Sequence, residues 1–130
     1  MIPIMGAVMR AIKINSETRT ITEVDCNGLA DEQSIVGGHI ESAHYFDNGV
    51  DRIMVNESGL YSLPADTAWF IVEGAFNPFK GNGVVVGVDE NTGDTVDAQI
   101  SLEDLKSKVR FLTHVEVHQL AQARAAYRTV

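Results

Sequence analysis

The sequence has little cysteine: Cys26 is the only one among 130 residues. An internal disulfide is therefore excluded, and no second thiol is present to complete a metal-binding pair. Basic residues are also scarce: 10 Lys and Arg stand against 18 Asp and Glu, which gives a formal net charge of -8. A positive face that binds a phosphate backbone is therefore not expected, and we predict no direct contact with nucleic acid.

Long hydrophobic runs are missing as well. The apolar N-terminal stretch MIPIMGAVM has no basic residue ahead of it, and Arg10 and Lys13 interrupt the pattern before it could span a bilayer. We expect neither a signal peptide nor a membrane segment, and the single thiol fits a reducing cytoplasm. With 45% apolar and 22% charged residues and only 3 prolines, the composition predicts one globular domain over residues 1–130.

Strand patterns dominate the first two thirds of the chain. Alternating residues flank the turn sequence NSETRT, and Asn48-Gly49 lies between two further strand-like runs, which is a strong hairpin signal. A short helix is predicted before Gly37 and Gly38, which would end it. The stretch with Pro64 and Pro78 is predicted to be mostly loop. The predicted strands are residues 7–14 with 21–24, 39–46 with 51–55, 83–88 with 95–100, and 68–72.

The last third changes to a helical period. Ser101 and Asp104 have the spacing of a capping box, and an apolar stripe follows, so the pattern predicts a helix over residues 102–112. Thr113 and Glu116 form a second box, which predicts another helix from about His114. We therefore predict an α+β fold: a mostly antiparallel sheet of about five or six strands, a short helix after the first hairpin, and a C-terminal helical pair packed on one side.

The segment THVEVH, residues 113–118, permits two interpretations. As a strand it would place His114, Glu116 and His118 on one side, which is a set of metal ligands. As a helix it would keep the two histidines on one face at i, i+4 spacing and turn Glu116 away from them. Histidines at the edge of an apolar helix face are usually half-buried and bonded to a neighbour, and we favour this interpretation.

Motifs for a reaction or a cofactor are not present in the sequence. It contains no G-x-x-x-x-G-K-[ST] phosphate loop and no G-x-S-x-G nucleophile turn. Ser58 is therefore interpreted as a turn residue, and Cys26, at the end of a predicted strand, as a structural thiol. We expect no cofactor.

Four segments together resemble a known family: VGGHIES, VNESGLYSLPAD, GNGVVVGVDENTGD and SLEDLKSKVRFL. They are similar to a domain-of-unknown-function family of short acidic proteins that are common in phages, plasmids and other mobile elements. The resemblance covers residues 8–112 and leaves a helical tail, residues 113–130, outside. It implies an accessory protein of a phage or mobile element that acts on host machinery or defence, with no assigned enzymatic activity.

The favoured hypothesis is thus a non-enzymatic protein that binds a host protein or a small molecule in the host cytoplasm. Its ligand-binding candidates lie in the glycine-containing loops: Asn56, Gly59, Lys80 and Asn82. Two alternatives stay open, a metal-dependent hydrolase that uses His114 and His118 and an acidic decoy of a DNA-binding host enzyme. The apolar N-terminus and the Ala-rich tail also suggest a homo-oligomer.

Overall fold

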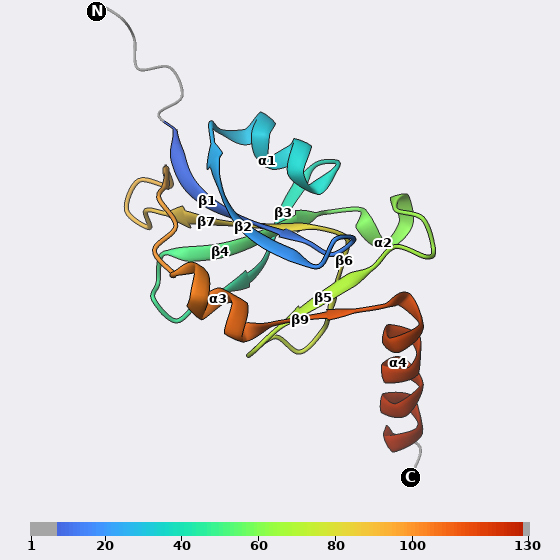
Figure 1. Ribbon diagram of the computed structural model, residues 1–130. Coiled ribbons are helices and arrows are strands. Elements are labelled where there is room, and N and C mark those ends of the chain that lie inside the picture. Colours follow the sequence, from blue (N-terminus) through green and yellow to red (C-terminus); the bar gives the residue numbers. More distant parts are fainter. Residues whose placement is uncertain (1–7, 129–130) are drawn as a thin grey trace, which may run out of the picture.

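A computed structural model of the chain describes residues 8–128. Its strands and helices follow the chain in the order shown in Figure 1. The strands are β1 (Met9–Asn15), β2 (Thr20–Cys26), β3 (Ile40–Tyr45), β4 (Asp51–Asn56), β5 (Trp69–Val72), β6 (Phe79–Lys80), β7 (Gly83–Val88), β8 (Thr95–Val96) and β9 (Val109–Leu112). The helices are α1 (Leu29–Val36), α2 (Gly59–Ser62), α3 (Leu102–Lys108) and α4 (His114–Arg128).

Two antiparallel sheets form the framework. The larger has the strand order β2-β1-β7-β4-β3, and β8 extends it by pairing with β7. The smaller has the order β6-β5-β9. Helix α1 covers one face of the large sheet, whereas α3 and the small sheet lie against the other face (Figure 1). The predicted α+β class and its mostly antiparallel sheet are confirmed; the second sheet was not predicted.

The central strand β7 explains why the sequence GVVVGV is apolar throughout. All six of its residues are buried, because both faces of the large sheet are covered. Val84 and Val86 belong to the core under α1, together with Val36. Val85 belongs to the core on the other side, together with Phe70 of the small sheet. Alternation of side chains along one strand thus joins the two halves of the core.

One predicted helix is too long. Residues 109–112 were predicted to continue the helix that begins at Leu102, but α3 ends at Lys108 and the next four residues form β9. The start was predicted correctly, since Ser101 caps the helix by accepting a hydrogen bond from the Asp104 N–H at 3.1 Å. Its end was wrong because β9 pairs with β5 over four residues, and this tertiary pairing overrides the helical period.

Helix α4 begins as its capping box predicts. The Thr113 N–H donates to Glu116 Oε1 at 3.0 Å, and the Glu116 N–H donates to Thr113 Oγ1 at 3.1 Å. The segment THVEVH is therefore helical after its first residue, and the strand interpretation is wrong. Strand β9 separates α4 from α3, so the two C-terminal helices do not form one contiguous hairpin.

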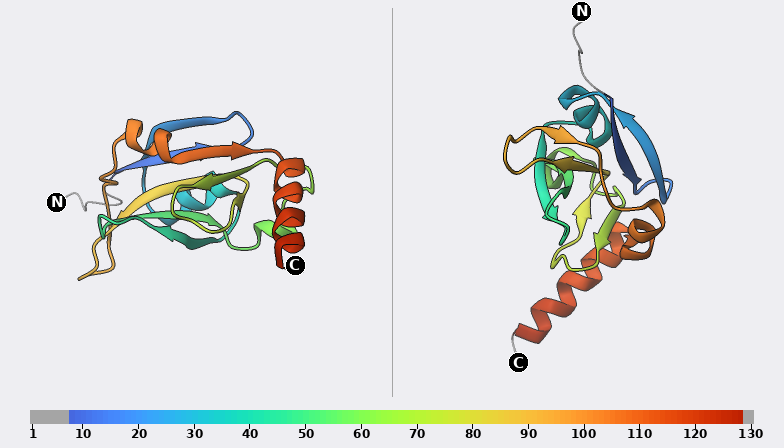
Figure 2. Two further views of the ribbon diagram at one scale, coloured as in Figure 1. Left: turned by 90° about the horizontal axis from the view of Figure 1, so that it is seen from below. Right: turned by 90° about the vertical axis from the view of Figure 1, so that its left-hand side faces the viewer.

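The position of α4 is peripheral (Figure 2). Arg124 ties the helix to the loop before β6: its Nη2 donates to the Phe76 carbonyl at 2.7 Å and its Nη1 donates to Asn77 Oδ1 at 3.2 Å. The guanidinium carbon also lies 4.3 Å from the centre of the Phe76 ring. The start of β1 lies at the opposite end of the molecule (Figures 1 and 2). Most of the apolar stretch that suggests a homo-oligomer, residues 1–7, falls outside the described residues.

Within residues 8–128, no helix combines the length and the hydrophobicity needed to cross a lipid bilayer.

Candidate functional site

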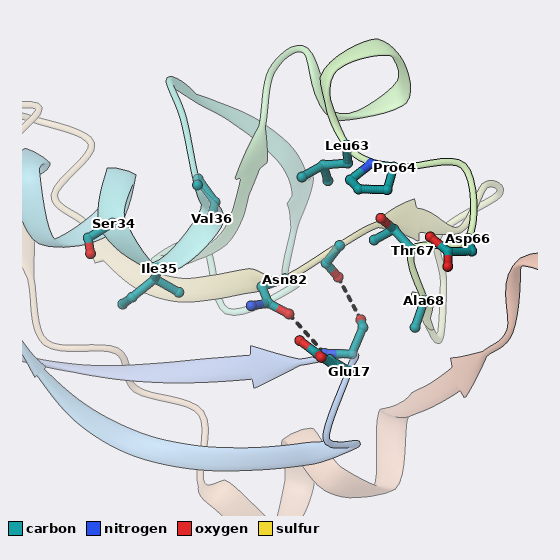
Figure 3. A pocket seen from close by; sticks show the side chains of 13 residues that line it. Glu17, Ser34, Ile35, Val36, Leu63, Pro64, Asp66, Thr67, Ala68 and Asn82 are labelled. Carbon is teal, nitrogen blue, oxygen red and sulfur yellow. Dashed lines mark hydrogen bonds between the residues drawn. The ribbon is translucent and has the colours of Figure 1, made fainter.

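A groove of about 590 Å³ lies beside the turn of the first hairpin (Figure 3). Its walls come from three places that are distant in the sequence: the C-terminal half of α1, the loop of residues 63–68 after α2, and the turn between β1 and β2. Gly81 and Asn82, just before β7, complete the lining. The groove is therefore created by the tertiary fold and corresponds to no continuous motif.

The hairpin turn is fixed to the groove by a buried serine. Ser16 is 1% exposed, and its Oγ donates to the Gly81 carbonyl at 2.6 Å. The Ser16 N–H donates to Asn82 Oδ1 at 3.0 Å (Figure 3). Gly81 adopts a φ of 86°, and a Cβ at this position would lie 2.7 Å from Leu63 Cδ1. The positive φ favours glycine at this position, and a larger residue would also displace the end of the Leu63 side chain.

The opposite walls are held by two polar side chains. Lys80 Nζ donates to the Leu63 carbonyl at 3.0 Å and so fixes the loop after α2. Asn56 is buried, and its Nδ2 donates to the carbonyl of Val36, the last residue of α1, at 3.3 Å. Asn56 Oδ1 accepts a hydrogen bond from the Ser58 N–H at 3.0 Å. These contacts connect α1, α2 and the loop, so the groove is shaped before any ligand arrives.

The four predicted ligand-binding residues thus lie close together. Asn82 lines the groove, whereas Asn56, Gly59 and Lys80 line an adjacent smaller cavity of about 130 Å³. A Cβ on Gly59 would lie 3.5 Å from Asn56 Cβ and 3.6 Å from the Lys80 carbonyl oxygen. The hydrogen bonds of Asn56 and Lys80 are made within the fold, which gives both side chains a role in shaping the walls. Direct contact of the four residues with a ligand stays a prediction.

The groove offers unpaired polar groups that the sequence did not single out. Among the described residues, no hydrogen-bond partner is found for the carboxylates of Glu17 and Asp66 or for the side-chain hydroxyls of Ser34 and Thr67. The lining also includes the apolar side chains of Ile35, Val36, Leu63, Pro64 and Ala68. The only signal for Glu17 and Asp66 is that each occupies a polar turn, and turns do not reveal which of them meet in space.

The electrostatic character of the groove is negative. No Lys, Arg or His is found among the described residues that line it. Arg19 occupies the same hairpin turn as Glu17, but it acts on Glu116 at the start of α4. The Thr113 N–H bond, followed by the Thr113 hydroxyl and then Arg19 and Arg110, lowers the pKa of Glu116. No cation is among the described residues that line the groove, although Lys80 Nζ donates a hydrogen bond to the carbonyl of Leu63, which does line it.

The two histidines of THVEVH lie elsewhere, on α4. His114 and His118 are both exposed, so the half-buried, bonded position favoured from the sequence is wrong; they border a shallow apolar hollow with Trp69 and Ala65. Within residues 8–128, no three His, Cys, Asp or Glu side chains come together in an arrangement that could hold a metal ion. A metal ion bound by His114 and His118 would need further ligands that the described residues do not supply, such as water molecules or side chains of a second copy. The hydrolase alternative gains no supporting contact from the fold.

Cys26 lies under the N-terminal part of α1 and is 1% exposed. Burial raises the pKa of its thiol, and the nearby carboxylate of Glu32 raises it further. A thiol that stays protonated is a poor nucleophile, so these surroundings fit the structural role predicted from the sequence.

Residues 9–110 match a family described as a domain of unknown function (DUF3846). The chain belongs to this family. Neither a curated protein nor a solved structure matches it. Every residue that lines the groove lies inside the DUF3846 match, whereas α4, with His114 and His118, lies beyond it. The groove thus lies within the part of the chain that matches DUF3846, and the histidine pair lies outside it.

Proposed function

We propose that this protein is a non-enzymatic accessory protein of a phage or another mobile element, which works in the host cytoplasm by binding a host protein through the groove. The observation that carries the proposal is the combination of fixed walls and free polar groups. Ser16, Asn56 and Lys80 hold the walls through hydrogen bonds. Glu17 and Asp66 remain available at the surface. Such preorganisation lowers the entropic cost of binding.

A protein partner fits the groove better than an enclosed small molecule. Pockets for small molecules usually bury most of the ligand surface. Here Glu17, Ser34 and Asp66 are exposed, so the rim is in contact with water. A side chain projecting from a partner could fill the groove while the surrounding surfaces meet at the rim. The net charge of -8 also favours a partner with a basic surface over direct nucleic-acid binding.

The test is site-specific photo-crosslinking in host extract, followed by binding measurements on the purified partner. A benzophenone amino acid replaces Ser34, which lines the groove, or Glu103, which is exposed on α3 against the opposite face of the large sheet. We expect one host protein to be crosslinked from position 34 only and to be displaced by unlabelled protein. The variant Asp66→Trp, which fills the groove from an exposed position, should weaken binding of the purified partner. Equal crosslinking from both positions, or none from position 34, would contradict the proposal.

Native mass spectrometry of the untagged protein separates the alternatives. A retained organic molecule at one per chain would favour a small ligand over a protein partner. A metal at one per chain that is lost in His114→Ala would favour the hydrolase. A bare chain agrees with the proposed function.

A further inference from the structure

We propose that the groove receives an arginine side chain from a basic protein segment. This inference rests on the proposed function and specifies the chemistry of the partner. Its starting point is charge complementarity: Glu17 and Asp66 lie on different walls, and no basic side chain among the described residues lines the groove to neutralise them. A cation entering from outside would meet carboxylates on more than one side.

The apolar part of the lining is suited to the stem of a long basic side chain. Ile35 and Val36 contribute from α1, and Leu63 and Pro64 contribute from the opposite loop. Arginine and lysine both bury their methylene stems on apolar surface while the charged head reaches polar groups. The lining of the groove provides both kinds of surface, apolar side chains on two walls and polar groups at the rim.

The distribution of acceptors favours arginine over lysine. A guanidinium group presents five N–H donors in one plane and is more weakly hydrated than an ammonium group. The carboxylates of Glu17 and Asp66 and the hydroxyl of Thr67 are three unpaired acceptors that come from two separate segments of the chain. A planar group with donors on several edges can use acceptors at different positions, whereas an ammonium group acts as a compact point charge.

The identity of the partner surface follows from the same chemistry. Arginine side chains projecting from a basic surface are what nucleic-acid-binding proteins present to phosphates. An acidic protein with an arginine-binding groove would compete for such a surface, which is the decoy hypothesis in a specific form. The net charge of -8 would speed the encounter at low salt.

The test is an NMR titration of the ¹⁵N-labelled full chain with three acetylated Gly-X-Gly amides, in which X is arginine, lysine or citrulline. Citrulline has nearly the shape of arginine but carries no charge. We expect saturable shifts of the amide signals of Ser34, Asp66 and Thr67 with arginine, affinity about threefold weaker with lysine, and no saturation with citrulline. The double variant Glu17→Gln/Asp66→Asn should weaken arginine binding by about tenfold.

A charge-matched control variant shows whether the effect is local. Asp25 and Glu90 are exposed carboxylates on β2 and on the turn after β7, and Asp25→Asn/Glu90→Gln removes the same charge away from the groove. This variant should bind the arginine peptide within about twofold of wild type, because exposed charges at a distance are screened. Equal weakening by both double variants, or equal binding of citrulline and arginine, would overturn the arginine assignment.

The two proposals fail in different ways. If the arginine peptide does not bind but the host protein is still crosslinked from position 34, the arginine assignment is wrong and the binding function stands. If neither the peptide nor a host protein binds at the groove, both are wrong.

Discussion

Asp51 supports a sharp prediction about what holds the DUF3846 domain together. It is the first residue of β4 and only 1% exposed. Its carboxylate accepts hydrogen bonds from the Gln99 N–H at 2.8 Å and the Ile100 N–H at 2.7 Å, and from Asn48 Nδ2 at 2.8 Å. The side chain therefore joins the turn between β3 and β4 to the segment that leads into α3. We predict that Asp51→Ala is the most damaging truncation of any carboxylate in the described chain.

The magnitude follows from the partners that the substitution would leave behind. A hydrogen bond to a charged group contributes about 1.5–3 kcal/mol to stability. The two backbone N–H groups of Gln99 and Ile100 are part-buried and would lose their acceptor, whereas Asn48 is exposed and can bond to water. Counting only the two backbone bonds at the low end, Asp51→Ala should lower the free energy of unfolding by about 3 kcal/mol. That is a large share of the 5–15 kcal/mol typical of a domain.

The assay is urea unfolding followed by tryptophan fluorescence. Trp69 is the only tryptophan and lies half-buried in β5, so its emission reports on the core. With a denaturant slope of about 1.5 kcal/mol/M, the midpoint should fall by about 2 M. The matched control is Asp47→Ala, which removes an exposed carboxylate from the same turn and should change the free energy by less than about 0.5 kcal/mol. A loss below about 1 kcal/mol for Asp51→Ala would refute the reasoning.

Two further predictions concern α1 and α4. Burial raises the pKa of Glu32, so the folded protein holds the proton of this carboxyl more tightly than the unfolded chain does. The stability that the group contributes is therefore complete below its unfolded pKa and is lost as the pH rises through its folded pKa. Glu32→Gln should therefore flatten the decline in unfolding free energy as the pH rises above the ordinary pKa of a glutamate. Parallel pH dependences of the unfolding free energy in urea for the two proteins would contradict this. Arg124→Ala removes the hydrogen bonds to the Phe76 carbonyl and to Asn77 Oδ1 and the contact with the Phe76 ring. Amide hydrogen exchange in α4 should therefore speed up by about tenfold, while exchange in β7 stays unchanged. Arg124→Lys should restore only part of the protection, and unchanged exchange in α4 for Arg124→Ala would show that the helix is held by other contacts.

Much of the fold could be predicted because local signals and tertiary structure agree. The Asn48-Gly49 turn joins β3 to β4, and Gly37, with a φ of 80°, ends α1. Both capping boxes mark true helix starts. The failure at residues 109–112 is instructive because Val109 and Leu112 satisfy an apolar helical stripe and are also suitable for a strand. Pairing with β5 decided between them, and sequence periodicity carries no information about a partner strand that lies far away in the chain.

The candidate site was harder to predict for a physical reason. Asn56 and Lys80 stand out in the sequence because they are polar residues near glycines in a stretch predicted to be mostly loop, although the structure places them at the ends of β4 and β6. Once such side chains are partly or fully buried, they must form hydrogen bonds, and the acceptors here are backbone carbonyls at the end of α1 and in the loop after α2. Their hydrogen-bonding capacity is then used to build the walls. The groups left for a ligand are the exposed ones, and nothing distinguishes Glu17 from other turn carboxylates until the fold is known.

The distinction between side chains that build the walls and exposed groups left for a ligand predicts that substitutions around the groove fall into two classes, those that lower stability and those that weaken binding. Asn56→Ala should lower stability by about 1–2 kcal/mol, because the buried Val36 carbonyl and the Ser58 N–H lose their partner. Any weakening of arginine binding by Asn56→Ala should be indirect, because the substitution alters the shape of the groove wall. Asp66→Asn removes no hydrogen bond found among the described residues, so it should weaken arginine binding while the urea midpoint stays within error. If Asp66→Asn destabilises the fold as much as Asn56→Ala does, Asp66 is part of the scaffold, and the distinction between wall and ligand groups does not hold.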